Sequence, residues 1–291
     1  MYQDTTTTVL RGRNSEIAIT PGSRTYTIGE RCNALGYSSV KKALEERRYD
    51  FIVERAVEQE RAGADIINVS TVGADVPEEY SLPEAVKQIA QAVSIPISVD
   101  FNSLGALESA LKLAPERTLV NSVSGERKKR EQVFELAKEY NCALIAMPCN
   151  DEGVPATAVS RVAIARELIN TADKFGIPKD DLIFDAICLA VGADQNAGLL
   201  TFETCRLLRS ELGVNITIGA SNVSFGLPNR RVLDSTYLAL AIASGMNVPL
   251  TDITIPSIKW AIRSADCCLG QDSYALRYIS EYRRENPTKA S

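Results

Sequence analysis

Short apolar runs alternate with longer stretches of helical periodicity along most of the chain. The apolar runs are nearly continuous, which is typical of parallel strands that are buried on both faces. The pattern predicts strands over residues 25–30, 64–70, 96–101, 118–123, 143–148, 182–187 and 215–221, with a weaker one over 248–253. It predicts helices over residues 39–62, 83–93, 104–113, 129–140, 160–175, 202–212 and 230–244, with further helices toward the C-terminus.

Eight strand-then-helix units in about 260 residues predict a (β/α)8 TIM barrel. The alternative is an open, doubly wound parallel sheet. Neither a GxGxxG nor a GxxxxGK[ST] loop follows a predicted strand, which counts against the nucleotide-binding forms of that alternative. No low-complexity linker divides the chain, so we expect one barrel domain over residues 25–291.

Residues 1–24 precede the first predicted strand and form an N-terminal extension. Within it, the apolar segments 8–10 and 17–19 flank a turn-like stretch over residues 11–14. This arrangement is consistent with a hairpin that covers the barrel floor, and equally with a tail that has no fixed structure.

Composition narrows the class of protein. The 291 residues are 45% hydrophobic and 24% charged, which is typical of a globular chain, and the net charge is −5. No basic stretch alternates with aromatic residues, so we expect no nucleic-acid partner. No apolar run is long enough to span a membrane, and the polar start lacks a signal-peptide core. We therefore expect a soluble, cytoplasmic protein.

The chain contains no histidine. This excludes Ser-His-Asp and Cys-His catalysis and the HExxH metal motif. Proton transfer must then use carboxyl, thiol, phenol or amine groups, or water. The seven cysteines include no CxxC pair, which favours reduced thiols over disulfides, and we predict no bound metal.

Polar side chains stand where the predicted strands end. In a (β/α)8 barrel these carboxyl ends form the functional face. One such residue on its own is often a helix cap, but capping does not readily explain the whole set, which is poor in Lys and Arg. Carboxylates and amides suit a flat heterocycle with several donors and acceptors better than a sugar phosphate. The strand ends are Gly29–Asn33, Asn68–Ser70, Asp100–Asn102, Asn121–Ser122, Met147–Asn150, Asp185 and Gly219–Ser224.

Several of these segments resemble one known family. The strings GERCN (29–33), ISVDFNS (97–103), LVNSVSGER (119–127), IFDAI (183–187) and GASNVSFGLPNRR (219–231) are similar to those of the pterin-binding enzymes. Within that family they most resemble methyltetrahydrofolate:corrinoid-protein methyltransferases and the folate module of cobalamin-dependent methionine synthase. Dihydropteroate synthases share the fold but carry a DIGGES-type segment where this chain reads INVSTVGAD (67–75).

The resemblance, which covers residues 25–270, implies a pterin-binding barrel that takes tetrahydrofolate in its mouth. Asp100, Asn121 and Asp185 match the positions that hydrogen-bond the pterin ring, and Asn222 matches the catalytic asparagine beside N5. Asn68 stands where the family often has an aspartate. The remaining residues that the resemblance places at the pterin site are Ser122, Gly219, Ser221 and Arg230.

The activity that the resemblance implies is methyl transfer between N5 of tetrahydrofolate and the cobalt of a cobalamin. The folate, or its 5-methyl derivative, is the substrate, and the cobalamin is carried by a separate corrinoid protein. Asn68 slightly favours methylation of tetrahydrofolate, because an amide cannot supply a proton to N5. The family also implies a homodimer. The alternatives are a dihydropteroate synthase-like barrel enzyme and a non-catalytic folate-binding protein.

Overall fold

Parallel strands at the centre of the molecule form a closed barrel, as predicted. The computed structural model describes residues 5–125 and 127–287. The strand order is β10-β3-β4-β5-β6-β7-β8-β9. The N–H groups of Val248 and Leu250 donate to the carbonyls of Ile216 and Ile218, which closes the barrel between its last two strands. The strands are β3 (Ile28–Asn33), β4 (Ile66–Ser70), β5 (Ile97–Asp100), β6 (Leu119–Ser124), β7 (Ala143–Met147), β8 (Leu182–Asp185), β9 (Asn215–Thr217) and β10 (Leu250–Thr251).

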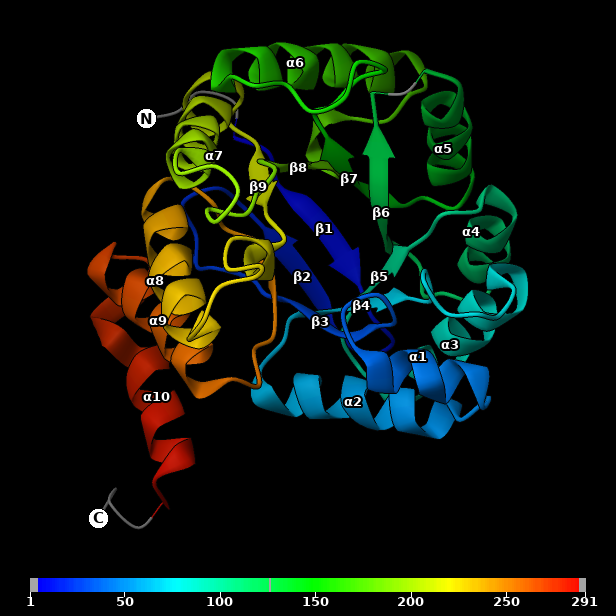
Figure 1. The fold of residues 1–291 in the computed structure, drawn as a ribbon, viewed down its shortest axis with the longest axis horizontal. Coiled ribbons are helices and arrows are strands. Elements are labelled where there is room, and N and C mark those ends of the chain that lie inside the picture. Colours follow the sequence, from blue (N-terminus) through cyan, green and yellow to red (C-terminus); the bar gives the residue numbers. More distant parts are fainter. Residues whose placement is uncertain (1–4, 126, 288–291) are drawn as a thin grey trace.

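Helices surround the barrel (Figure 1). Their buried faces pack on the outward-facing Val, Ile and Leu side chains of the strands, which explains why most strand segments are largely apolar. The helices are α1 (Ser38–Glu45), α2 (Tyr49–Ala62), α3 (Glu78–Ala92), α4 (Leu104–Leu111), α5 (Arg127–Glu139), α6 (Ala158–Lys174), α7 (Ala197–Leu207), α8 (Arg230–Ala243), α9 (Pro256–Cys268) and α10 (Leu276–Glu285), with short helical turns η1 (Lys179–Asp181), η2 (Leu208–Leu212), η3 (Ala220–Asn222) and η4 (Ser273–Ala275).

Several predicted elements differ from the observed ones. The helices predicted over 83–93 and 202–212 each begin five residues earlier, as α3 and α7. The helix predicted over 39–62 is two helices, because Arg47 has φ +55° and interrupts the helical backbone. The strand predicted over 25–30 lies over 28–33, with an irregular register between Gly29 and Cys32. The strand predicted over 215–221 ends at Thr217, and the chain then turns into η3.

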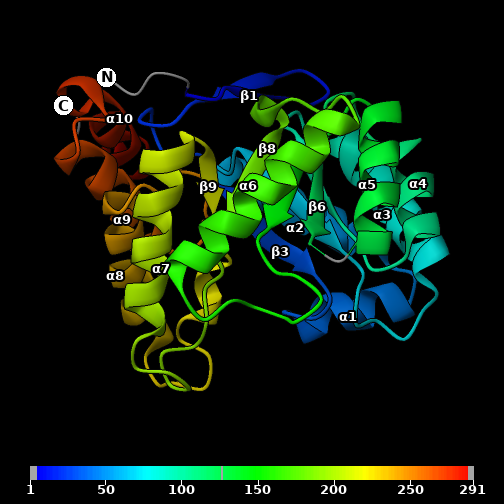
Figure 2. The ribbon, with the colours of Figure 1, turned by 90° about the horizontal axis from the view of Figure 1, so that it is seen from above.

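An antiparallel hairpin covers the amino-terminal end of the barrel (Figure 2). It consists of β1 (Thr8–Arg11) and β2 (Glu16–Ile19). Leu10 and Ile19 are fully buried against the inward-facing side chains that lie nearest the amino-terminal end of the barrel. Asn215 donates to the Ile19 carbonyl at 2.8 Å, which ties the hairpin to β9. The hairpin closes this end, and the cavity described below opens at the opposite end.

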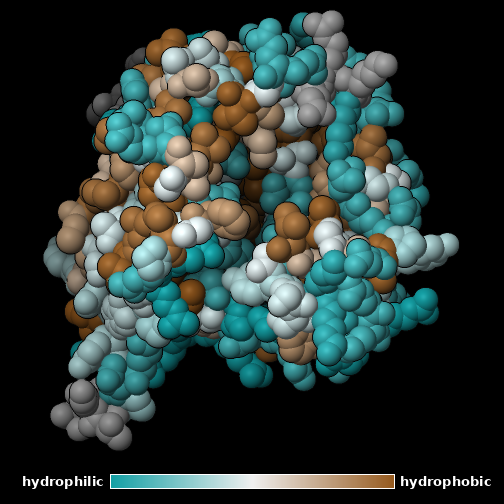
Figure 3. Space-filling model, viewed as in Figure 1, coloured by the Kyte–Doolittle hydropathy of each residue, from teal (hydrophilic) through white to brown (hydrophobic). Residues whose placement is uncertain are grey.

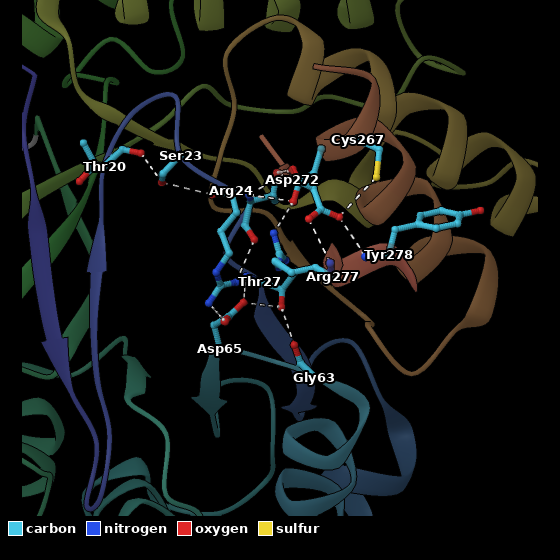
Figure 4. A network of polar contacts seen from close by, with 12 residues as sticks. Thr20, Ser23, Arg24, Thr27, Gly63, Asp65, Cys267, Asp272, Arg277 and Tyr278 are labelled. Atoms are coloured by element: carbon cyan, nitrogen blue, oxygen red, sulfur yellow. Dashed lines mark hydrogen bonds and ion pairs between the residues drawn. The ribbon is translucent and has the colours of Figure 1, made fainter. Parts of the chain in front are cut away.

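A polar network fastens the chain segment before β3 to the C-terminal helices (Figure 4). The N–H of Thr27 donates to Asp65 at 2.8 Å. Asp266 on α9 is fully buried, and it accepts the Thr25 hydroxyl at 2.6 Å and the Arg277 guanidinium at 3.1 Å. Charge-assisted hydrogen bonds of this kind hold the segment that leads into β3. None of the helices in the described part of the chain is long and apolar enough to cross a membrane.

Candidate active site

A cavity of about 200 Å³ lies inside the barrel mouth, at the carboxyl ends of the strands. Figure 3 looks at this face and shows the hollow at its centre. The cavity therefore lies at the end of the barrel where enzymes of this fold carry their sites. Its lining combines four of the predicted site residues with apolar neighbours: Asn121, Ile145, Met147, Asp185, Ile187, Cys188, Thr217, Gly219, Asn222 and Leu250.

Three of the predicted residues form a hydrogen-bonded row across β4, β5 and β6. The Asn121 amide donates to Oδ1 of Asn68 at 3.3 Å, and the Asn68 amide donates to Oδ2 of Asp100 at 3.4 Å. Asn68 is fully buried. Because it presents an amide N–H where a carboxylate would repel Asp100, Asn68 orients its two neighbours without adding charge. Burial raises the pKa of Asp100 to about 6.

Asp185 ends β8 on another side of the cavity. Its Oδ1 accepts the backbone N–H of Ile187 at 2.8 Å. Burial raises the pKa of Asp185 to about 6, partly offset by that hydrogen bond and by the charge of Arg161. Both aspartates are therefore mainly ionised above neutral pH, and each can accept N–H donors from a ligand.

Asn222 is positioned by the η3 turn that follows β9. Its backbone N–H donates to the Gly219 carbonyl at 3.2 Å. A Cβ atom at Gly219 would lie 3.0 Å from Nδ2 of Asn222, so a larger residue there would crowd the amide. The glycine therefore leaves the Asn222 side chain room at the edge of the cavity.

Glu30 belongs to the same mouth; it lies in the predicted strand end Gly29–Asn33 but is not among the residues that the resemblance places at the pterin site. Its Oε2 accepts the Ser221 hydroxyl at 3.1 Å, and its Oε1 accepts the Tyr37 hydroxyl at 3.5 Å. Burial, together with the nearby charges of Asp252 and Asp234, raises the pKa of Glu30 to about 7. The signal was present in the GERCN string, where a glutamate follows a glycine inside a barrel strand.

Five predicted residues lie outside the lining of this cavity: Asn68 and Asp100, which belong to the row described above, Ser221, which donates to Glu30, and Ser122 and Arg230. Arg230 donates to the Ser224 hydroxyl at 2.8 Å and to the Ser221 carbonyl at 2.6 Å, so it braces the loop after η3. Ser122 lines a neighbouring cavity of about 140 Å³, which also borders on Asp100 and Asn121.

The rim of the mouth carries exposed apolar side chains. Leu35 follows β3, Val154 follows β7, Leu189 follows β8 and Phe225 follows η3, and Phe225 is 73% exposed. In Figure 3 apolar atoms lie on both sides of the hollow. Exposed apolar residues gathered around a site are typical of a surface that another molecule covers.

No group of three or more acidic or cysteine side chains suited to a metal ion is found within residues 5–125 and 127–287. The described cysteines carry no disulfide. What the site offers is hydrogen bonding and proton exchange at carboxyl groups.

The chain shows clear similarity to known proteins. The family model described as pterin binding enzyme matches residues 29–251. A methylcorrinoid:tetrahydrofolate methyltransferase from Eubacterium limosum is 31% identical over 88% of this chain and 96% of its own length. Methionine synthases from Mycobacterium tuberculosis and Mycobacterium leprae are 28% and 27% identical over 76% of this chain, which spans only 20% and 19% of their length.

Solved structures with the same fold include two dihydropteroate synthases. The one from Clostridium difficile, determined in the presence of pteroic acid, is 22% identical with a TM-score of 0.69 over 85% of this chain and 98% of its own. The one from Vibrio fischeri is 17% identical with a TM-score of 0.69 over 91% and 99%. These likenesses establish the fold. Together with the family match over most of the barrel, they lead to one conclusion: this chain is a member of the pterin-binding enzyme family.

Proposed function

We propose that the protein is a methyltransferase that moves a methyl group between N5 of tetrahydrofolate and the cobalt of a corrinoid protein. The observation that carries the proposal is the presence of Asn121, Asp185 and Asn222 around one cavity, with Asp100 hydrogen-bonded into the same row. The Eubacterium limosum relative, named for this activity, supports it.

The carboxylates and amides fit the edge of a pterin ring. Asp100 and Asp185 each accept N–H donors, while Asn121 offers one donor and one acceptor. Asn68 holds Asp100 and Asn121 in place by its two hydrogen bonds. We propose that Ser122, Gly219 and Ser221 border the bound ring and that Arg230 acts by bracing the loop that carries Asn222.

Asn222 and Glu30 have different roles at N5 of the folate. In one direction, N5 of tetrahydrofolate attacks the methyl carbon, the carbon–cobalt bond breaks and its electron pair stays on cobalt. The proton that N5 then loses passes to the Glu30 carboxylate. In the reverse direction, protonated Glu30 supplies that proton and makes N5 a better leaving group. The Asn222 amide stabilises N5 as charge develops on it.

The direction we propose is methylation of tetrahydrofolate by a methylated corrinoid. A pKa of about 7 lets Glu30 serve as acceptor or donor near neutral pH. Asn68, however, provides no additional acid where the family often has an aspartate. Methylation of N5 is the reaction that needs a proton acceptor and does not need a strong acid.

The second substrate comes with a partner. We propose that the corrinoid protein covers the barrel mouth and contacts the exposed rim residues Leu35, Leu189 and Phe225. The homodimer and the cytoplasmic location stay predictions. Light scattering of the purified protein measures its oligomeric state.

The competing function is dihydropteroate synthesis, the activity for which the two solved structures are named. Both functions are tested by anaerobic absorption spectroscopy and a matched synthase assay. We expect tetrahydrofolate to convert methylcobalamin to cob(I)alamin when the protein is present, and no condensation of p-aminobenzoate with a dihydropterin diphosphate. Turnover in the synthase assay, or folate binding with no change in the cobalamin spectrum, would overturn the proposal.

A further inference from the structure

A guanidinium group is fully buried behind the wall of the active-site cavity. Arg161 on α6 is 1% exposed. Its Nε donates to the Pro155 carbonyl at 3.1 Å, and its Nη1 donates to the carbonyls of Ala186 and Ile187 at 2.8 and 3.0 Å. These acceptors belong to the loops after β7 and β8. Arg161 therefore links the two loops from outside the barrel and lies one layer away from the cavity.

No carboxylate in the described residues lies within ion-pair distance of Arg161. A buried cation without a nearby anion is costly, and burial lowers the pKa of Arg161 accordingly. The titratable groups that face it are Asp185 on β8, Tyr237 on α8, Cys188 in the loop and Cys205 on α7.

Of the titratable groups that face Arg161, Asp185 is the one that ionises near neutral pH. Burial raises the pKa values of Cys188 and Cys205 to about 12 and raises the pKa of Tyr237 as well. The pKa of Asp185 is about 6. The anion that balances Arg161 is therefore the Asp185 carboxylate, which lies on the opposite side of the turn whose carbonyls Arg161 binds.

The turn between them has an unusual backbone. Ile187 has φ +59°, a left-handed conformation that a β-branched side chain rarely adopts. Its carbonyl is held by Arg161 and by the Thr201 hydroxyl, at 3.0 and 3.1 Å. Its N–H donates to Oδ1 of Asp185 at 2.8 Å, and this N–H belongs to the same peptide unit as the Ala186 carbonyl, which Arg161 binds at 2.8 Å. Arg161 therefore fixes the peptide whose amide orients the carboxylate, and the bonds to the Ile187 carbonyl fix the next peptide of the turn.

We propose that Arg161 is the positioning residue for Asp185: it fixes the Ile187 turn and supplies the positive charge that keeps Asp185 an oriented acceptor for the pterin ring. Arg161 acts only through Asp185 and through the turn. This inference rests on the proposed function, because it takes Asp185 to be a contact of the folate.

The test separates charge from geometry with three variants. Arg161→Gln removes the charge, Arg161→Lys keeps the charge but cannot bind the three carbonyls at once, and Thr201→Val removes one donor to the Ile187 carbonyl without changing charge. Arg166→Gln is the control, since Arg166 is an exposed cation on the same helix. The first readout is the titration of the Asp185 carboxyl carbon by 13C NMR without folate, assigned from the spectrum of Asp185→Asn. The second is tetrahydrofolate affinity at pH 6 and pH 8.

We expect Arg161→Gln to move the Asp185 titration to higher pH by one unit or more and to weaken folate binding at least tenfold at neutral pH. Arg161→Lys should keep the titration near that of the wild type. Thr201→Val should weaken folate binding several-fold at both pH values with no change in titration, and Arg166→Gln should change neither.

An unchanged Asp185 titration in a folded Arg161→Gln protein would overturn the inference. Where that variant does not fold, unchanged folate affinity in Thr201→Val overturns it instead. The NMR titration needs no substrate, so absence of folate binding in the wild type would refute the proposed function while the coupling of Arg161 to Asp185 is still measured.

Discussion

The Ser221 hydroxyl donates to Oε2 of Glu30 at 3.1 Å, and this bond joins the first barrel strand to the turn that carries Asn222. It places a carboxyl group with a pKa of about 7 beside the residue that we assign to N5. A proton-exchanging group and an orienting amide are thus neighbours at one edge of the mouth.

Glu30→Gln should lower methyl transfer by about a hundredfold, because it removes a positioned proton acceptor. Methylation of tetrahydrofolate by the wild type should slow as pH falls below 7, since Glu30 is then protonated, and the reverse reaction should slow as pH rises above 7. The variant should lose this inflection in a pH–rate profile measured with free cobalamin. The exposed Glu131→Gln variant serves as the control. An inflection near pH 7 that survives in Glu30→Gln would remove Glu30 from the mechanism.

Asn222→Ala should reduce the rate of methyl transfer about a hundredfold while changing tetrahydrofolate affinity by only a few-fold. The amide is assigned to charge that develops in the transition state, and losing such a donor slows the reaction more than it weakens binding. Single-turnover kinetics and calorimetry separate the two effects, with the surface variant Asn286→Ala as the control. Equal losses in rate and affinity would instead make Asn222 a plain binding residue.

Asp100→Asn should stabilise the folate-free protein at pH 8 by about 1–3 kcal/mol while weakening folate binding. The pKa of Asp100 is raised to about 6 in the folded state, so the stability that its protonated form provides is complete below pH 4 and lost as pH rises through 6. The amide cannot ionise and avoids that loss. Urea unfolding at pH 8 and pH 4.5 checks this, because the difference from the wild type should largely disappear at the lower pH. A variant less stable than the wild type at pH 8 would contradict the burial argument.

Phe225→Asp should raise the KM for the corrinoid protein and leave the reaction with free methylcobalamin nearly unchanged. The side chain is exposed on the rim, where we place the partner and not the pterin. Tyr274→Asp is the matched control, since Tyr274 is an aromatic residue that is 93% exposed and far along the chain in η4. Similar effects of both variants, or loss of activity with free methylcobalamin in Phe225→Asp, would argue against a docking rim.

Asp266→Ala should lower the free energy of unfolding by about 3–5 kcal/mol, because it leaves the buried end of Arg277 and the Thr25 hydroxyl without their acceptor. Chemical denaturation measures the change, with the exposed Asp173→Ala on α6 for comparison. A loss below about 1 kcal/mol would show that the network in Figure 4 contributes little to holding the segment before β3.

The barrel could be predicted from the chain because parallel strands covered on both faces leave continuous apolar runs with long amphipathic helices between them. The break in the predicted helix at Arg47 could not be predicted, since a left-handed residue at a helix end is normally signalled by glycine or asparagine. Strand ends also gave Asp100, Asn121, Asp185 and Asn222, whose side chains lie at the mouth.

Two residues show where such reasoning stops. Glu30 lies within a strand whose register is irregular, so neither its inward direction nor its contact with Ser221 follows from alternation along the sequence. Arg161 is a charged residue on an amphipathic helix, which on sequence alone indicates the solvent-facing side. Its burial follows from carbonyls in two distant loops, and only the folded chain brings these together.

The most direct test of the account follows the methyl group itself. Methylcobalamin labelled with 13C at its methyl carbon is incubated anaerobically with tetrahydrofolate and the protein, and the product is observed by 13C NMR. We predict that the label leaves cobalt and appears on N5 of the folate, and that Asp185→Asn and Asn222→Ala slow its arrival. Label that stays on cobalt with the wild-type protein in the presence of excess tetrahydrofolate would contradict the account.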